Sequence, residues 1–303
     1  MFTTHSTFRQ GLIWAFIGVL VFSFSLPMTK LALVGFDPFV ISMGRAAIAG
    51  IIAAVLLIIF KVPFPQRRHI RALLFTAAGA VVGWPIFIGL ALERTTSSHA
   101  AVIVSVMPAV TAAFAVVRHK EITTSRFWVG VGISTVLVMG FTLSRGGGLT
   151  ADLTADLFIA LAVISSAICY VEGAGLTSVM PGWQVISWVV VISLPLTIPS
   201  TIGLWVLSGD NLPTDLSVWI GMGYLGLFSM YLGFFAWYRG LALAGVAQGS
   251  QIQQLQGLLT LIWSVWLLGE TLSWVTMAAA VAVVVAVAWT QKTRHVVIVA
   301  PEE

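Results

Sequence analysis

The chain of 303 residues lacks the charge of a soluble protein and the ligands of a metal centre. Only 9% of its residues are charged and 59% are apolar, whereas about a quarter of the residues of a soluble domain are charged. Such a composition excludes a soluble globular fold. The single cysteine, Cys169, cannot form an internal disulfide, and the five histidines are scattered along the chain. We therefore expect no metal, redox group or other cofactor.

The apolar residues gather into ten segments, each long enough for a helix that crosses the bilayer, which takes about 20 such residues. These segments contain Gly, Pro and Ala without strict alternation, which favours helices over β-barrel strands. The predicted fold class is an all-α membrane protein with ten transmembrane helices and short connections. The segments are 11–33, 38–60, 70–92, 97–117, 127–144, 153–174, 183–207, 215–242, 247–268 and 272–290.

Basic residues are distributed unevenly over the two membrane faces. Ten spans place both termini on one face, which collects eleven Lys and Arg residues against three on the other. Because cytoplasmic loops carry the excess of positive charge, the segments 1–10 and 291–303 are expected in the cytoplasm. The basic stretch from Lys61 to Arg71 fits this topogenic role, with an anionic-lipid or nucleic-acid patch as the alternative. The net charge of +4 therefore says nothing about a polymer partner, and we expect no nucleic acid among the partners.

The two halves of the chain resemble each other in sequence. Each half holds five helices, an odd number, so the second copy enters the membrane from the opposite side. Inverted repeats around a midplane site are typical of secondary transporters. We expect repeats at 11–144 and 153–290, with a linker at 145–152. The matches are GLAL at 89–92 and 240–243, VIS at 40–42 and 185–187, and Glu121 with Glu270, at offsets of 151, 145 and 149.

Four short motifs also connect the chain to a known family. They are ALERTTSSHA at 91–100, SVMP at 105–108, KEIT at 120–123 and LGETL at 268–272. With them the chain resembles the drug/metabolite transporter superfamily, specifically ten-helix members of the EamA family, over essentially its full length. It is similar within that family to the YddG-type exporters of aromatic amino acids. It departs from the pattern at Arg118-His119 and in the glutamine-rich stretch 248–256.

Polar residues inside the spans are candidates for function, because they are unfavourable there unless they face a cavity or a partner. Gln251 and Gln254 lie on one helical stripe of the ninth span, which could line a water-filled path. Their amides offer a donor and an acceptor to a zwitterionic substrate. The alternative is contact between helices. Ser105 lies on the equivalent fourth span and is a further candidate.

Aromatic residues are numerous, and several lie within the spans rather than at their ends. Those near the ends are expected in interfacial belts. The others could wall a substrate cavity, where each ring contact adds about a kcal/mol, or could pack in the core. These cavity candidates are Phe24, Trp84, Tyr170, Tyr231 and Trp237.

Few ionisable residues lie in or beside the spans. Arg45 lies inside the second span, and we expect it to be paired, for example with Glu93, or to reach the interface, although unpaired it would attract a carboxylate. His99 is a cavity candidate, since histidine titrates near physiological pH. With Glu172 it could couple transport to protons, but these two residues lie toward opposite faces. Recognition is therefore expected to depend on neutral side chains.

Prolines interrupt several of the expected helices. Each removes an intrahelical hydrogen bond and kinks the helix, which could provide a hinge for alternating access or simply a packed bend. The hinge candidates are Pro27, Pro85, Pro108 and Pro195.

These features lead to one expected function and several alternatives. We expect a secondary transporter that exports small amphiphilic metabolites, and the resemblance implies aromatic or other neutral amino acids. The alternatives are an exporter or importer of another metabolite or a hydrophobic drug, and a channel. An enzyme is not expected, because almost all carboxylates lie in loops. The expected partners are a small-molecule substrate and the bilayer, for a monomer or weak homodimer in the inner membrane of a bacterium.

Overall fold

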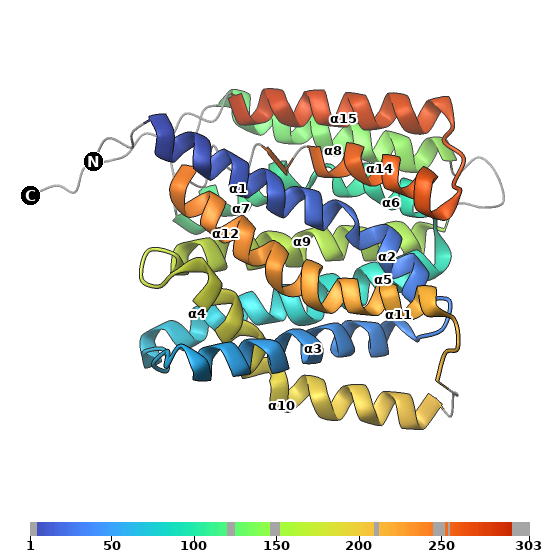
Figure 1. The fold of residues 1–303 in the computed structure, drawn as a ribbon. Coiled ribbons are helices and arrows are strands. Elements are labelled where there is room, and N and C mark those ends of the chain that lie inside the picture. The colour runs from blue at the N-terminus through green and yellow to red at the C-terminus, as the bar shows by residue number, and fades with distance from the viewer. Residues whose placement is uncertain are drawn as a thin grey trace, which may run out of the picture.

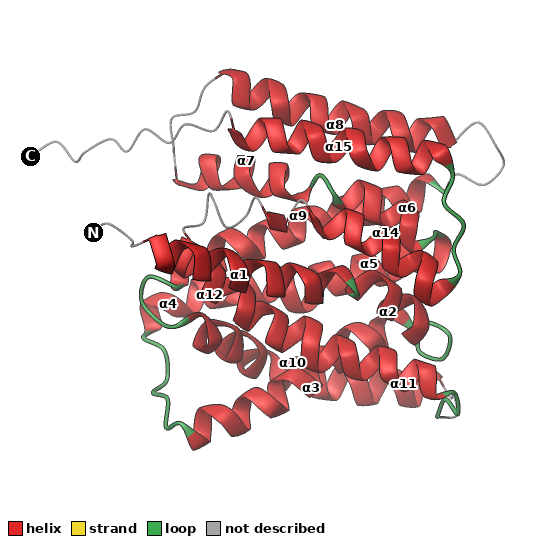
Figure 2. Cartoon of the chain, turned by 45° about the horizontal axis from the view of Figure 1, so that its top comes forward, coloured by secondary structure: helices red, strands yellow, loops and turns green. Residues whose placement is uncertain are grey.

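The computed structural model describes residues 5–119, 125–145, 152–208, 212–244, 252–253 and 255–292. Within these residues the chain is a bundle of helices joined by short loops (Figures 1 and 2). The helices are α1 (His5–Ser23), α2 (Ser25–Ala32), α3 (Pro38–Ile59), α4 (Arg67–Ala77), η1 (Ala78–Gly83), α5 (Trp84–Arg94), α6 (Ser97–Val104), α7 (Met107–His119), α8 (Ser125–Arg145), α9 (Leu153–Leu176), α10 (Gly182–Ser208), α11 (Leu216–Gly223), η2 (Tyr224–Leu232), α12 (Gly233–Ala244), α14 (Leu255–Leu268) and α15 (Trp274–Lys292), where η1 and η2 are π-helices.

Seven described segments are long and apolar enough to cross a membrane. Three further apolar helices are shorter and fall on the remaining expected spans, at Trp128–Leu137, Leu255–Leu268 and Trp274–Ala286. The prediction of an all-helical, multi-pass membrane protein is therefore confirmed, whereas the number of ten spans stays a prediction. The seven segments are Thr7–Ala32, Pro38–Ile59, Arg67–Arg94, Ser97–Arg118, Leu153–Leu176, Gly182–Leu207 and Leu216–Ala244.

The two halves of the bundle are built alike and packed antiparallel. In each half a π-helix joins two α-helices, with η1 between α4 and α5 and η2 between α11 and α12. The equivalent helices α3 and α10 pack together and run in opposite directions (Figure 1). Helix α1 packs on α12, while its equivalent α9 packs on α4 and α5. This exchange of partners is the arrangement that an inverted repeat requires.

One end of the bundle, here called the basic end, holds the start of α1, the start of α4 and the end of α15 (Figure 1). At the opposite end, α3, α9 and α11 each begin at an aspartate that accepts a first-turn backbone N–H at 2.8 or 2.9 Å. Such caps satisfy amides that have no partner within the helix. The aspartates are Asp37, Asp152 and Asp215. Arg94 lies 3.2 Å from Asp152, and its hydrogen bond lowers the pKa of that carboxyl.

Two spans are interrupted next to an expected proline. Helix α2 begins two residues before Pro27, and α7 has Pro108 as its second residue. Pro85 is the second residue of α5, the helix that follows η1 directly. Pro195, in contrast, lies inside the continuous helix α10. The prolines thus mark changes of helical geometry at three of the four positions, while their role as hinges stays a prediction.

Helices α1 and α12 approach each other closely because glycines face the partner backbone. A Cβ atom on Gly18 would lie 3.0 Å from the Cα of Trp237, and one on Gly240 would lie even closer to Ala15, 2.7 Å from its Cα. Small residues allow such close approach between membrane helices. The contact brings Phe22 of α1 to 5.1 Å from Phe234 of α12, measured between ring centroids.

Candidate functional site

A small cavity lies in the middle of the bundle, where the two halves meet. Its volume of about 20 Å³ holds roughly one water molecule. The first half contributes α1, α2, α3, η1 and α5, and the second half contributes α9, η2, α12 and α14. Its polar lining residues are Ser25, Arg45, Ser166, Ser229 and Gln256, and its aromatic ones are Phe22, Trp84, Tyr170 and Phe234.

Arg45 of α3 is the only charged residue among the described residues that line this cavity. Its side chain is buried, with 2% of the residue exposed, and its Nη2 donates to Oγ of Ser229 at 2.8 Å. Ser229 Oγ in turn lies 2.7 Å from Ser25 Oγ. The Nε of Arg45 has no hydrogen-bond partner in the described part of the chain.

The expected pairing of Arg45 with Glu93 is wrong. The ion pairs of the described residues do not include Arg45, and Glu93 is exposed near the end of α5. The physical reason is the direction in which Arg45 faces, inward to the cavity and Ser229 rather than along α3 to the membrane surface. The expectation that recognition depends on neutral side chains rather than on a fixed ion pair stays a prediction, although this cavity also holds a charged residue.

Gln256 of α14 supplies a neutral polar group to the same cavity. It is buried, and its Oε1 has no hydrogen-bond partner among the described residues. Gln253 is also buried. Its Nε2 donates to Sδ of Met107 at 3.2 Å, while its Oε1 likewise has no hydrogen-bond partner among the described residues. The two glutamines favoured from the sequence, Gln251 and Gln254, lie outside the described residues.

Only two of the five aromatic candidates line the cavity, namely Trp84 and Tyr170. The ring of Tyr170 lies 6.5 Å from Phe22 and 6.0 Å from Phe234, so three rings from α1, α9 and α12 form one wall. Phe22 and Phe234 were not singled out from the sequence, which shows no signal for them, because helix rotation decides which aromatic residues face inward.

The other three aromatic candidates pack outside the described lining of the cavity. Trp237 lies against Tyr170 at 5.7 Å between ring centroids and is almost fully buried. Phe24 stacks on Trp263 at 4.2 Å, and the hydroxyl of Tyr231 lies 2.7 Å from Oγ of Ser187. Of the three, Trp237 therefore packs directly against a residue that lines the cavity.

His99 and Ser105 also lie elsewhere than expected. The Nε2 of His99 is 2.6 Å from a carboxylate oxygen of Asp156, in a largely buried pair near the start of α6 and α9. Ser105 stands at the break between α6 and α7, where its hydroxyl donates to the carbonyl of Ala101 at 2.8 Å. Neither residue belongs to the described lining of the central cavity.

The end of the bundle opposite the basic end is tied together by Glu270. One carboxylate oxygen accepts the backbone N–H of Ser97 at 2.8 Å, and the other accepts the N–H and the hydroxyl of Ser98 at 2.8 and 2.5 Å. These amides open helix α6, where the helix dipole also favours a negative charge. Since Glu270 belongs to the second half and α6 to the first, we call this cluster, Ser97, Ser98 and Glu270, the latch.

The local sequence explains why Glu270 reaches α6. Gly269 has a φ of 64°, in the left-handed region that favours glycine, and it ends helix α14 with its N–H bonded to the carbonyl of Val265. The chain turns back there, and Glu270 N–H bonds to the carbonyl of Ser264. From the sequence Glu270 was only a repeat marker, because its partners are about 170 residues away.

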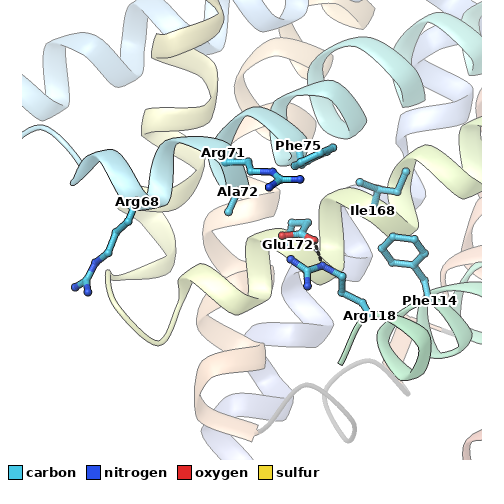
Figure 3. A pocket seen from close by; sticks show the side chains of 8 residues that line it. All are labelled: Arg68, Arg71, Ala72, Phe75, Phe114, Arg118, Ile168 and Glu172. Carbon is cyan, nitrogen blue, oxygen red and sulfur yellow. Dashed lines mark hydrogen bonds and ion pairs between the residues drawn. The ribbon is translucent and has the colours of Figure 1, made fainter. Parts of the chain in front are cut away.

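At the basic end the bundle is hollowed by a vestibule of about 530 Å³ between α4, α7 and α9. Figure 3 shows Arg118 directed at Glu172, whose Oε1 it meets through Nε at 2.7 Å. Arg71 lies over the ring of Phe75, 5.6 Å from its centroid, and Arg68 adds a third positive charge. Ile168 of α9 lines the vestibule, and the next residue, Cys169, lines the central cavity.

The chain is a bundle of membrane-crossing helices in two antiparallel halves. A polar cavity lies between the end closed by the latch and the end that contains the vestibule. Together these features define a membrane transporter. The model of the EamA-like transporter family matches residues 9–143 and 153–291. The chain belongs to the EamA-like transporter family.

Two known proteins are similar to this chain. It is 41% identical over 283 residues to a Bacillus subtilis (strain 168) protein named "Uncharacterized transporter YdeK", covering 92% of this chain and 96% of the relative. A crystal structure of another protein, 17% identical, matches with a TM-score of 0.67 over 93% of this chain and 98% of that one. This second likeness shows a shared fold alone. The predicted family is confirmed, and the resemblance to aromatic amino acid exporters stays a prediction.

Proposed function

We propose that this protein is a secondary transporter that exports small amphiphilic metabolites by alternating access, with aromatic or other neutral amino acids as the leading class. The observation that carries the proposal is the unequal closure of the two ends. The latch ties the halves together at one end, while the other end is hollowed by the vestibule. A polar and aromatic cavity lies between them. This is the arrangement of a carrier open to one side.

The lining of the cavity supports the substrate class. Three rings, those of Phe22, Tyr170 and Phe234, offer an apolar wall that favours an aromatic or aliphatic body. Sites for small molecules usually measure about 300–1,000 Å³, so the central cavity must widen when substrate enters from the vestibule. A movement of one half against the other would provide that space.

The proposed location is the inner membrane of a bacterium, with the basic end in the cytoplasm. The Bacillus relative supports a bacterial membrane, and the excess of basic residues supports the orientation. Substrate would then enter the vestibule from the cytoplasm, and export requires the latch to open.

Counterflow in proteoliposomes tests the proposal. Vesicles loaded with unlabelled tryptophan, phenylalanine or leucine should take up the same labelled amino acid transiently and saturably, while protein-free vesicles should not. Exchange of hydrophobic cations without any amino acid would replace the substrate class with the drug alternative. Currents that rise with voltage and do not saturate with substrate would contradict a carrier and favour a channel.

A further inference from the structure

We infer that Arg45 anchors a carboxylate of the transported molecule, so that the substrates are carboxylates and the corresponding amines without that group are not carried. The inference rests on the proposed function, because it assigns a ligand chemistry to the same central cavity. The sequence alone predicts that Arg45 either pairs with a carboxylate or reaches the membrane interface.

The first argument is the missing counter-charge. A guanidinium remains charged in proteins, and a buried charge without a partner is unfavourable. Arg45 is 2% exposed, and within the described part of the chain it bonds to the neutral hydroxyl of Ser229 and to no carboxylate. A ligand that brings its own negative charge removes this imbalance each time it binds.

The second argument is the number of unused donors. A guanidinium has five N–H donors in a planar fork that suits two parallel hydrogen bonds to a carboxylate. Among the described residues Arg45 donates only to Ser229, and its Nε is unpaired. The bond to Ser229, which is itself held by Ser25, fixes the orientation of the fork and leaves donors for a ligand.

The third argument is the acceptor in the same cavity. The unpaired Oε1 of Gln256 can accept a hydrogen bond from an ammonium group. The nearby rings can also attract a cation through their faces. A donor fork and a neutral acceptor around an aromatic wall match an amino acid that has one carboxylate, one ammonium and an apolar side chain.

Matched ligand pairs test the inference without any mutation. Tryptophan is compared with tryptamine, phenylalanine with phenethylamine, and leucine with isoamylamine, by counterflow and by the ligand-induced rise in melting temperature of the purified protein. We expect exchange and stabilisation by the amino acid of a pair and neither effect by its amine. Equal exchange of both members would overturn the carboxylate anchor while transport stands. If no amino acid and no amine exchanges or stabilises, the proposed function itself fails.

Variants of Arg45 then separate an anchor from a structural residue. In Arg45→Gln we expect loss of the ligand-induced stabilisation, with a melting temperature without ligand that is unchanged or raised, since the unbalanced charge is gone. Arg45→Lys keeps the charge without the planar fork and should raise the apparent KM at least tenfold. Arg94→Gln, an exposed arginine outside the cavity, is the matched control and should transport as the parent does. Amino acid transport by folded Arg45→Gln or Arg45→Lys within twofold of the parent would overturn the anchor.

Discussion

At the scale of single residues, two unpaired polar atoms in one buried cavity distinguish this protein, Nε of Arg45 and Oε1 of Gln256. Buried polar groups are nearly always hydrogen-bonded. Other buried atoms of the described residues also lack a partner, such as Oε1 of Gln253, but these two belong to residues that line the central cavity. Their opposite hydrogen-bonding character agrees with the proposed ligand.

Gln256→Leu tests the acceptor. Leucine is similar in size, so the fold should persist, while the hydrogen bond to a substrate ammonium is lost. A hydrogen bond to a charged group contributes about 1.5–3 kcal/mol, so the apparent affinity for amino acids should fall roughly tenfold or more. Competition of unlabelled amino acid against labelled uptake measures this change.

Gln253→Leu is the matched control, because that glutamine is equally buried but bonds to Met107 and does not line the cavity. We expect its affinity for amino acids to match the parent. Similar losses in both variants would argue that buried glutamines of this segment matter only for folding, and the role of Gln256 would be abandoned.

The sequence predicted residue types better than residue roles. It placed Arg45, Trp84 and Tyr170 inside spans and named the last two as cavity candidates, whereas all three line the cavity. It did not reveal that Arg45 faces a cavity. The sequence alone does not distinguish an arginine that pairs with a carboxylate of another helix from one that has no such partner. Ser229 and Ser25 were missed for a similar reason, since their contact joins residues 204 positions apart.

At the scale of helices, the latch is the contact that the proposed transport cycle must break. A carboxylate at the start of α6 makes three charge-assisted hydrogen bonds that join the two halves. Opening this end must break all three, so the latch contributes to the barrier and to the preferred state.

Glu270→Gln should shift the protein toward the state open at the latch end. The amide keeps the shape but loses the charge and one acceptor, and at about 1.5–3 kcal/mol for each such bond the open population should rise at least tenfold. The single native cysteine reports the change, because Cys169 lines the cavity and is 1% exposed. A membrane-impermeant thiol reagent added on the latch side should label the variant faster.

Glu93→Gln removes the same charge from an exposed carboxylate near the same end and serves as control, with a labelling rate that should equal the parent's. Cys169→Ser measures the background. If Glu270→Gln and the parent are labelled at the same rate, the latch does not hold this end closed.

The close contact between α1 and α12 gives a prediction of stability. Valine at position 18 would press against the backbone of Trp237, and overpacking of this kind costs about 1–3 kcal/mol. Gly18→Val should therefore lower the melting temperature in detergent. Gly132→Val, at a position where a new Cβ meets nothing within 4 Å, should leave it nearly unchanged. Equal melting temperatures for the two variants would contradict the proposed packing.

Helix boundaries were predictable where a proline marks them, as at the start of α2 and of α7. The π-helix η2 was not, because no proline lies within Tyr224–Leu232. Its observed contacts are non-local, since Gly226 lies against Ile48 of α3 and Ser229 accepts from Arg45 of α3.

At the scale of the whole molecule, the distribution of basic residues predicts the orientation. A fluorescent protein fused to the C-terminus should fold and fluoresce, and alkaline phosphatase at the same place should be inactive, because both would remain in the cytoplasm. Fusions that truncate the chain after Gly147 should show the reverse pattern. The ratio of the two activities should differ at least tenfold between the sites, and equal ratios would reject the predicted topology.

The general architecture followed from composition, span length and the internal repeat, and the all-helical fold and the family agree with it. The arrangement of the spans did not follow. Hydropathy gives the number and length of candidate helices. The close contact of α1 with α12 depends on glycines that face the partner helix, and the sequence does not show which glycines do so.

The paired π-helices also bear on how such a protein arose. A π-helix lies in the third predicted span of each half, as η1 in the first half and as η2 in the second. Such π-helical segments are rare in proteins. A duplication that produced the two halves would account for the presence of a π-helix in both. The two π-helices then occupy equivalent places beside the central cavity, where η1 contributes Ala80 and η2 contributes Ser229 to the lining.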